Sequence, residues 1–161
     1  MASMIEERLA QMGLALPDAP APAGSYVPWK RAGSLVFISG QLPPLEADGA
    51  RPARFAGRLG EGVVVADGQD AARLAALAVL SQLRGACAGD LDRVAGCVRI
   101  GGFVACTPDF TGHPQVVNGA SDLIAEALGE DGTHARAAVG VQSLPMGACV
   151  EIEAVFEVSA R

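Results

Sequence analysis

The stretch HARAAVGVQSLPMGACVEIEAVFEV, residues 134–158, decides the fold that we expect for this chain. Its residues alternate with a period of two over 135–141 and again over 150–158, which is typical of β-strands. Segment 144–147, between the two runs, contains proline and glycine and is typical of a turn. The stretch therefore predicts two strands that form a terminal hairpin.

Two charged residues in these strands, Arg136 and Glu151, are candidates for a functional site. If the apolar positions of both strands face the helices of a one-sided sheet, Arg136 and Glu151 both project from the opposite face. An arginine in a strand of small residues, answered by an acid, suggests a carboxylate anchor that faces an acid or a base. Burial of the pair on that face would need a partner subunit.

The rest of the chain predicts further elements before residue 134. Residues 1–23 are expected to form an N-terminal helix, over 5–12, and a Pro/Ala linker. A helix over 69–87 has Asp67 as its predicted N-cap, and Gly129 is the predicted stop of a helix over 114–128. The strands are expected near Tyr26 and over 35–39, 62–66 and 92–106.

This order of elements predicts an α+β fold in a single domain, residues 1–161, with a mixed sheet and two main helices packed on one face. The sheet face without helices is then left open to solvent unless another element or subunit packs on it. Its expected outward positions are small or apolar, which favours burial by other subunits. These positions are Cys97, Ala138, Cys149 and Val155.

Composition narrows the function classes. The chain has 161 residues, 50% of them hydrophobic, with a formal net charge of −6 and no cluster of basic residues, which argues against nucleic-acid binding. The longest apolar run, residues 74–80, is far shorter than the ~20 residues that cross a bilayer, and the first residues carry charges. We therefore expect a cytoplasmic protein with no membrane partner.

The sequence predicts no cofactor and no metal site. The four cysteines form no C-x-x-C pair, and His113 and His134 do not form an H-E-x-x-H motif. GRLGEG at 57–62 has the wrong glycine order for a dinucleotide loop, and Lys30 is the one lysine. Cysteines within strands are usually core filling. A catalytic thiol would need a histidine neighbour, which only a structure reveals.

Three segments together resemble the Rid family of reactive-intermediate deaminases, the YjgF-type proteins also called endoribonuclease L-PSP. They are GSYVPWKRAGSLVFISGQLP at 24–43, CTPDF at 106–110 followed by Asn118, and ARAAVGVQSLPMGACVEIEA at 135–154. The last looks like the family's terminal signature. The resemblance covers nearly the whole chain and implies a chorismate-mutase-like fold.

The resemblance also implies an assembly and an activity. Family members are homotrimers with a central barrel of sheets and active sites in the clefts between subunits. The implied reaction is hydrolysis of enamines and imines such as 2-aminoacrylate to a 2-oxo acid and ammonia, as in 2-iminobutanoate/2-iminopropanoate deaminases. The implied ligand is thus a small carboxylate-bearing imine, enamine or 2-oxo acid.

By resemblance, Arg136 binds the substrate carboxylate through its planar fork, and Glu151 orients or deprotonates the attacking water. Tyr26 and Asn118 match positions that line the cleft, and the backbone around Ser39 and Gly40 would close it. Other interpretations remain open. Arg136 and Glu151 could form an interface salt bridge, Tyr26 could serve packing alone, and Asn118 could cap or bridge backbone.

The chain departs from the family pattern at three places. Segment 45–60 is longer than in the archetypal deaminases, Ala78 stands where an asparagine is frequent, and His134 replaces a common proline. These departures indicate a less characterised subgroup and leave the substrate open. The alternative function is a non-catalytic metabolite-binding trimer. An endoribonuclease or a chorismate-mutase-like isomerase fits the charge pattern less well.

Overall fold

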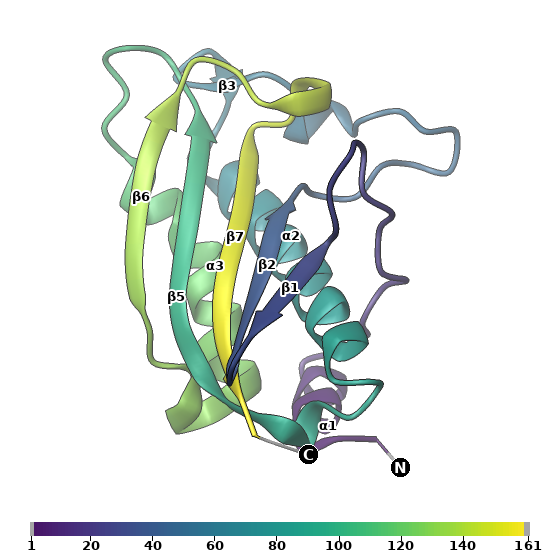
Figure 1. The fold of residues 1–161 in the computed structure, drawn as a ribbon. Helices are drawn as coiled ribbons and strands as arrows, with labels where there is room; N and C mark the ends of the chain where they lie inside the picture. Colours follow the sequence, from purple (N-terminus) through teal and green to yellow (C-terminus); the bar gives the residue numbers. More distant parts are fainter. Residues whose placement is uncertain (1, 160–161) are drawn as a thin grey trace.

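A computed structural model describes residues 2–159 and contains a five-stranded mixed sheet with α-helices on one face (Figure 1). The helices are α1 (Met4–Gln11), α2 (Val65–Ala86) and α3 (His113–Leu128). The strands of this sheet are β1 (Trp29–Ala32), β2 (Leu35–Gln41), β5 (Val94–Ala105), β6 (Ala135–Val141) and β7 (Val150–Val158). A small parallel pair, β3 (Arg58–Leu59) and β4 (Gly62–Val63), lies outside it, and four 3₁₀ turns are Ala53–Phe55, Leu91–Arg93, Gly129–Gly132 and Pro145–Gly147. The predicted α+β class is confirmed.

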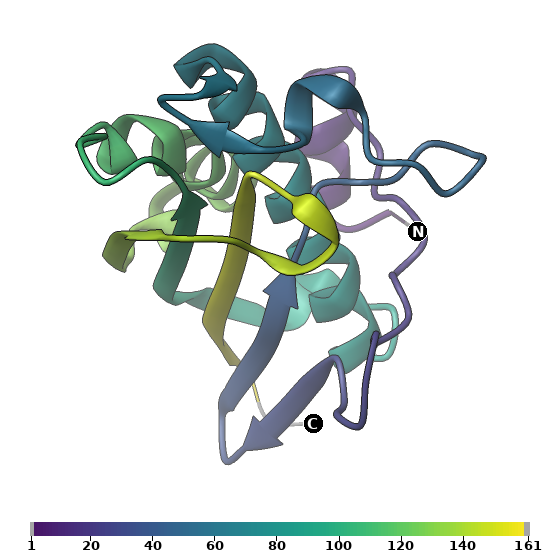
Figure 2. The same ribbon diagram turned by 90° about the horizontal axis from the view of Figure 1, so that it is seen from above.

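The strand order is β1-β2-β7-β5-β6, with β6 parallel to β5 and β7 antiparallel to both β2 and β5. The predicted terminal hairpin is therefore wrong. Figures 1 and 2 show that the chain leaving β6 passes over the end of β5 before it enters β7. The central place suits β7 because Val150, Ile152, Ala154, Phe156 and Val158 are all buried against the helices.

The two long helices form as the periodicity predicts, with one boundary corrected. The helix α2 begins at Val65, so Asp67 lies in its first turn and is not the N-cap, and the predicted strand over 62–66 shrinks to β4. An acid in the first turn is favoured by the helix dipole, and Asp67 also lies 3.7 Å from the guanidinium of Arg54. The helix α3 ends at Leu128, and the positive φ of 68° at its C-cap Gly129 stops it there, as predicted.

The helices α2 and α3 approach closely at a glycine. A Cβ at Gly119 would lie 2.0 Å from the carbonyl oxygen of Gln69, so a larger residue would push the helices apart. The side chain of Gln69 also donates to the carbonyl oxygen of Gln115. This contact fixes the position of α3 over the sheet, and with it the positions of Asn118 and Ser121.

Several residues expected on the helix-free face lie elsewhere. Cys97 and Cys149 are buried in the core, and Ala138 packs against it. A β-bulge between Cys97 and Arg99 reverses the alternation of β5, which leaves Val98 exposed. Val155 does lie on the helix-free face, opposite Phe37 of β2, whose side chain is 45% exposed. Within residues 2–159, no helix combines the length and apolar character needed to cross a membrane.

Candidate functional site

Arg136 lies on the edge strand β6 and reaches toward α3. Its guanidinium donates to Oδ1 of Asn118 at 2.8 Å and to Oγ of Ser121 at 3.1 Å. Asn118 and Ser121 stand three positions apart on α3, so their side chains share one face of the helix. Arg136 has no carboxylate within salt-bridge distance among residues 2–159, and it is exposed. The guanidinium is therefore oriented by neutral groups and keeps its charge for a ligand.

His134 extends this group, which we call the arginine cluster: Asn118, Ser121, His134 and Arg136. Nδ1 of His134 lies 2.6 Å from the carbonyl oxygen of Gly132, and Nε2 lies 2.9 Å from Oγ of Ser121. The carbonyl requires a proton on Nδ1. Because Ser121 accepts from Arg136, its hydroxyl hydrogen is free to donate to Nε2. A directed chain of hydrogen bonds thus orients Arg136.

A second group, the carboxylate cluster, consists of Tyr26, Ser39, Gly40 and Glu151. Ser39 and Gly40 form a bulge in β2, between the paired residues Ile38 and Gln41. Glu151 of β7 lies over Gly40 so closely that a Cβ there would be 1.8 Å from Oε1. The glycine therefore makes room for the carboxylate.

The remaining two members frame the bulge. Oγ of Ser39 donates to the carbonyl oxygen of Val27 at 2.8 Å, which ties the bulge to the segment before β1. The hydroxyl of Tyr26 accepts from the backbone N–H of Ala23 at 3.3 Å, while half of the Tyr26 side chain remains exposed. The tyrosine is thus available for contact with a ligand or a partner chain.

The surroundings of Glu151 favour its protonated form. Burial raises the pKa of the Glu151 carboxyl above its usual range, and the charge of Glu153, two positions along β7, raises this pKa further. The guanidinium of Arg99 pairs with Glu153 at 2.9 Å, and among residues 2–159 Glu151 forms no salt bridge. A carboxylate whose pKa is raised is a stronger base than an ordinary glutamate and takes a proton from water more readily.

The expectation that Arg136 and Glu151 share one sheet face is wrong. Arg136 is paired with Ile100, whose buried side chain faces the helices, so Arg136 projects on the helix side at the edge of the sheet. Glu151 is paired with Phe103 and projects from the helix-free face. The small residues Ala138 and Gly140 let the helix side of β6 pack against α3. This packing turns Ala135, Ala137 and Val139 outward.

The two clusters are also far apart along the sheet. The strand β5 lies between β6 and β7, and the partners Ile100 and Phe103 are three positions apart on it. With strands about 4.8 Å apart and a rise of about 3.3 Å per residue, Cα of Arg136 and Cα of Glu151 are roughly 14 Å apart. One chain does not bring the two charged groups together.

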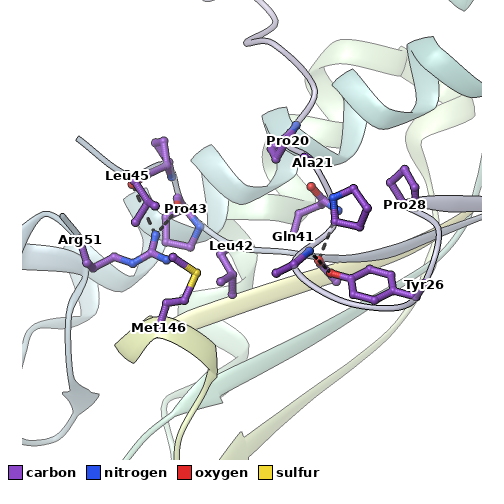
Figure 3. Close-up of a pocket in the computed structure, with 14 residues that line it drawn as sticks. Pro20, Ala21, Tyr26, Pro28, Gln41, Leu42, Pro43, Leu45, Arg51 and Met146 are labelled. Carbon is purple, nitrogen blue, oxygen red and sulfur yellow. Dashed lines mark hydrogen bonds between the residues drawn. The ribbon is translucent and has the colours of Figure 1, made fainter. Parts of the chain in front are cut away.

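A cavity of about 310 Å³ adjoins the carboxylate cluster at Gly40 (Figure 3). Tyr26 lies at one end of the group drawn there, and Arg51 and Met146 lie at the other. Leu45 and Arg51 come from the 45–60 segment, so this segment shapes the cavity wall. The guanidinium of Arg51 donates to the carbonyl oxygen of Pro43.

Ser121 was not anticipated from the sequence. The available signal was its spacing, since Asn118 and Ser121 are polar and lie one helical turn apart in an otherwise small and apolar segment. Among residues 2–159, no three histidine, cysteine, aspartate or glutamate side chains are grouped so that they could hold one metal ion.

Comparisons with known proteins place this geometry in context. Residues 6–157 match the family model described as "YjgF/chorismate mutase-like, putative endoribonuclease". Protein TCP17 of Trypanosoma cruzi is 45% identical over 156 residues, which cover 96% of this chain and 94% of that protein. The crystal structure of Atu1372 from Agrobacterium tumefaciens, of unknown function, is 44% identical with a TM-score of 0.87 and covers 97% of this chain and 93% of its own. TdcF of E. coli with bound serine is 26% identical, with a TM-score of 0.62 over 88% of this chain and 94% of its own.

Proposed function

The chain belongs to the YjgF/chorismate mutase-like family, and on this premise we propose that it hydrolyses enamine and imine intermediates to 2-oxo acids and ammonia, at sites shared between subunits of a homotrimer. The observation that carries the proposal is the pair of separate clusters: an oriented, unpaired guanidinium at one place and a partly buried carboxyl at another. Hydrolysis of an imino acid needs both a cation that binds the substrate carboxylate and a group that transfers protons.

The arginine cluster would bind the substrate carboxylate. A guanidinium has a planar fork that matches a carboxylate bidentately, and Asn118 and Ser121 already hold this fork in position. The relative TdcF was crystallised with bound serine, an amino acid that carries a carboxylate and a nitrogen on the neighbouring carbon. An imino acid carries the same two groups. Such binding would fix the C=N carbon in space.

The carboxylate cluster would handle the protons. Glu151 in its ionised form takes a proton from water as the oxygen attacks the C=N carbon, the C=N electron pair moves to nitrogen, and Glu151 gives that proton to the nitrogen. The ionised Glu151 then takes the proton of the new hydroxyl group as the C=O bond forms, and gives it to the nitrogen as the C–N bond breaks, so ammonia leaves and the 2-oxo acid remains. The raised pKa of Glu151 supports this double use, because it makes the carboxylate a stronger base than an ordinary glutamate.

Assembly would bring the clusters together. They lie on opposite sides of the sheet in one chain, so a site with both would combine the arginine cluster of one subunit with the carboxylate cluster of the next. Phe37 and Val139, exposed by 45% and 46%, lie on the helix-free face and supply apolar surface for such contacts.

The direct test measures ammonia and 2-oxo acid release by the purified protein from imino acids generated in situ. The panel should vary in side-chain size, because the 45–60 segment shapes the adjoining cavity. Release above the spontaneous rate supports the proposal. Saturable binding of 2-oxo acids without any acceleration would support the alternative, a non-catalytic metabolite-binding protein.

A mixing experiment tests the shared site. Arg136→Ala and Glu151→Gln are each expected to be inactive, and the two are unfolded, mixed in equal amounts and refolded together. Each site draws on two subunits, and each contributor is the competent one in half of the cases, so about one quarter of the sites should be intact. Recovery near this fraction supports sharing. No recovery, with mixed trimers demonstrated by mass spectrometry, contradicts it.

A further inference from the structure

A thiol and an imidazole that belong to neither cluster meet at the end of β5. Sγ of Cys106 lies 3.4 Å from Nε2 of His113, within the contact distance of a hydrogen bond to sulfur. Cys106 directly follows β5, and His113 is the first residue of α3. The loop between them folds back, so that the imidazole lies beside the thiol. The sequence alone had left open whether any cysteine has a histidine neighbour.

The other cysteines lack this chemistry. Cys87, Cys97 and Cys149 are buried, and burial raises the pKa of Cys97 to about 12 and that of Cys149 to about 11. Burial also raises the pKa of Cys87. Such thiols hold their protons and exclude reagents. Cys106 is only partly buried, so it alone among the four is open to a reagent.

The local backbone is shaped for the pair. A Cβ on Gly140 of β6 would lie 2.5 Å from Nε2 of His113 and 2.7 Å from Sγ of Cys106, so only glycine permits both groups at this place. The ring of Phe110 packs edge-on against the imidazole, with centroids 5.4 Å apart, and limits its rotation. The backbone N–H of Cys106 donates to Val141 at 3.1 Å, which holds the thiol against β6.

The pair opens into a cavity of about 610 Å³. Its walls include Thr107, Phe110 and Gln142, so it offers both apolar and neutral polar surface. Arg58 also lines it, but its guanidinium pairs with Glu61. Gly140 is four positions beyond Arg136 on β6, so their Cα atoms are roughly 13 Å apart, and the cavity walls contain no residue of the arginine cluster. It is therefore a separate site suited to small, uncharged, partly apolar molecules.

We propose that Cys106 and His113 form a second reactive site, in which a thiolate adds to uncharged α,β-unsaturated carbonyl compounds. Nε2 of His113 takes the thiol proton, and the sulfur forms a bond to the β-carbon. The C=C electron pair moves to the α-carbon, which takes the proton back from His113, so the product is a thioether and nothing is oxidised. The proposal does not depend on imine hydrolysis.

The test uses N-ethylmaleimide as the electrophile and peptide mapping by mass spectrometry as the readout. On the folded protein, one label is expected, at Cys106, whereas the urea-unfolded chain should label at all four cysteines. A free cysteine is only a few per cent thiolate at neutral pH, so the folded protein should react on the order of tenfold faster than a short cysteine peptide at pH 7. A rate no faster than the peptide, or labelling of another cysteine first, overturns the proposal.

Two further measurements separate activation by His113 from mere exposure. The variant His113→Gln keeps a polar side chain but removes the base, and the rate should fall about tenfold toward that of the peptide. On the unaltered protein, acrylamide, a second uncharged α,β-unsaturated carbonyl compound, should also react on the order of tenfold faster than it does with the peptide at pH 7. An acrylamide rate equal to that of the peptide contradicts the proposal even if the variant does not fold.

Discussion

Gly40→Ala is the sharpest test of the carboxylate cluster, because it displaces the Glu151 carboxylate and leaves Glu151 itself unchanged. The new Cβ would lie 1.8 Å from Oε1 of Glu151 and 2.7 Å from its Cδ, against ordinary contact distances of 3.4 Å and more. The carboxylate must therefore retreat by about 1.6 Å, the difference between 3.4 and 1.8. Gly40 has no positive φ, so its backbone conformation suits alanine and the fold should persist.

The expected loss of activity follows from that displacement. A shift of about 1 Å in a catalytic group costs about a hundredfold in rate, so kcat/KM for imine hydrolysis should fall by at least about a hundredfold, near 2.7 kcal/mol. The assay is ammonia release, with circular dichroism to confirm the fold. The matched control is Gly101→Ala, whose Cβ would meet Oε1 of Glu153 at 2.6 Å and should leave most of the activity. Full activity in Gly40→Ala, or an equal loss in both variants, would refute a role for the position of Glu151.

Four further outcomes are expected. Arg136→Lys keeps the charge but loses the fork, so kcat/KM should fall about ten- to a hundredfold in the same assay, and an unchanged value would exclude a bidentate carboxylate contact. Because the pKa of Glu151 is raised in the folded state, its ionised form lowers the stability of the fold above that folded pKa, and this loss disappears as the pH falls below the pKa of the unfolded chain. Glu151→Gln should thus be more stable than the parent in urea at pH 7, and the difference in unfolding free energy should narrow toward pH 4. An equal difference at both pH values would contradict the raised pKa. Light scattering at micromolar concentration should give three times the chain mass of 16.3 kDa, and a stable monomer would end the shared-site proposal. Activity should survive a strong chelator, since the sequence has no metal-binding motif, and a loss restored by one particular metal would reveal a site built between chains.

Periodicity in the sequence predicted the strands and helices well, because a strand or a helix follows from its own residues. The alternation at 150–158 predicted β7 and its buried face, and Gly129 predicted the end of α3. Pairing follows from contacts between distant segments, which period alone does not encode. The hairpin was therefore predicted where the chain instead crosses β5.

The sequence offered candidate site residues, but it did not predict how they are arranged. In β6, alanine, valine and glycine alternate with little difference in apolar character, so the pattern did not indicate which face packs against a helix. The decisive information lies on α3, where Asn118 and Ser121 offer polar partners to Arg136 at the sheet edge. The close approach of Glu151 to Gly40, and of His113 and Cys106 to Gly140, likewise cannot be predicted from the sequence.

The central place of β7 also has a consequence for the synthesis of this protein. Every other strand of the five-stranded sheet precedes β7 in the chain, yet β2 and β5 are joined only through it, with Leu35 paired to Glu157. A ribosome must therefore make β7 before the sheet can close, and β2 and β5 wait with unpaired edges until then. Such long-range pairing is slow and exposes the nascent chain to aggregation. Pausing of translation just before residue 150 should increase its dependence on chaperones.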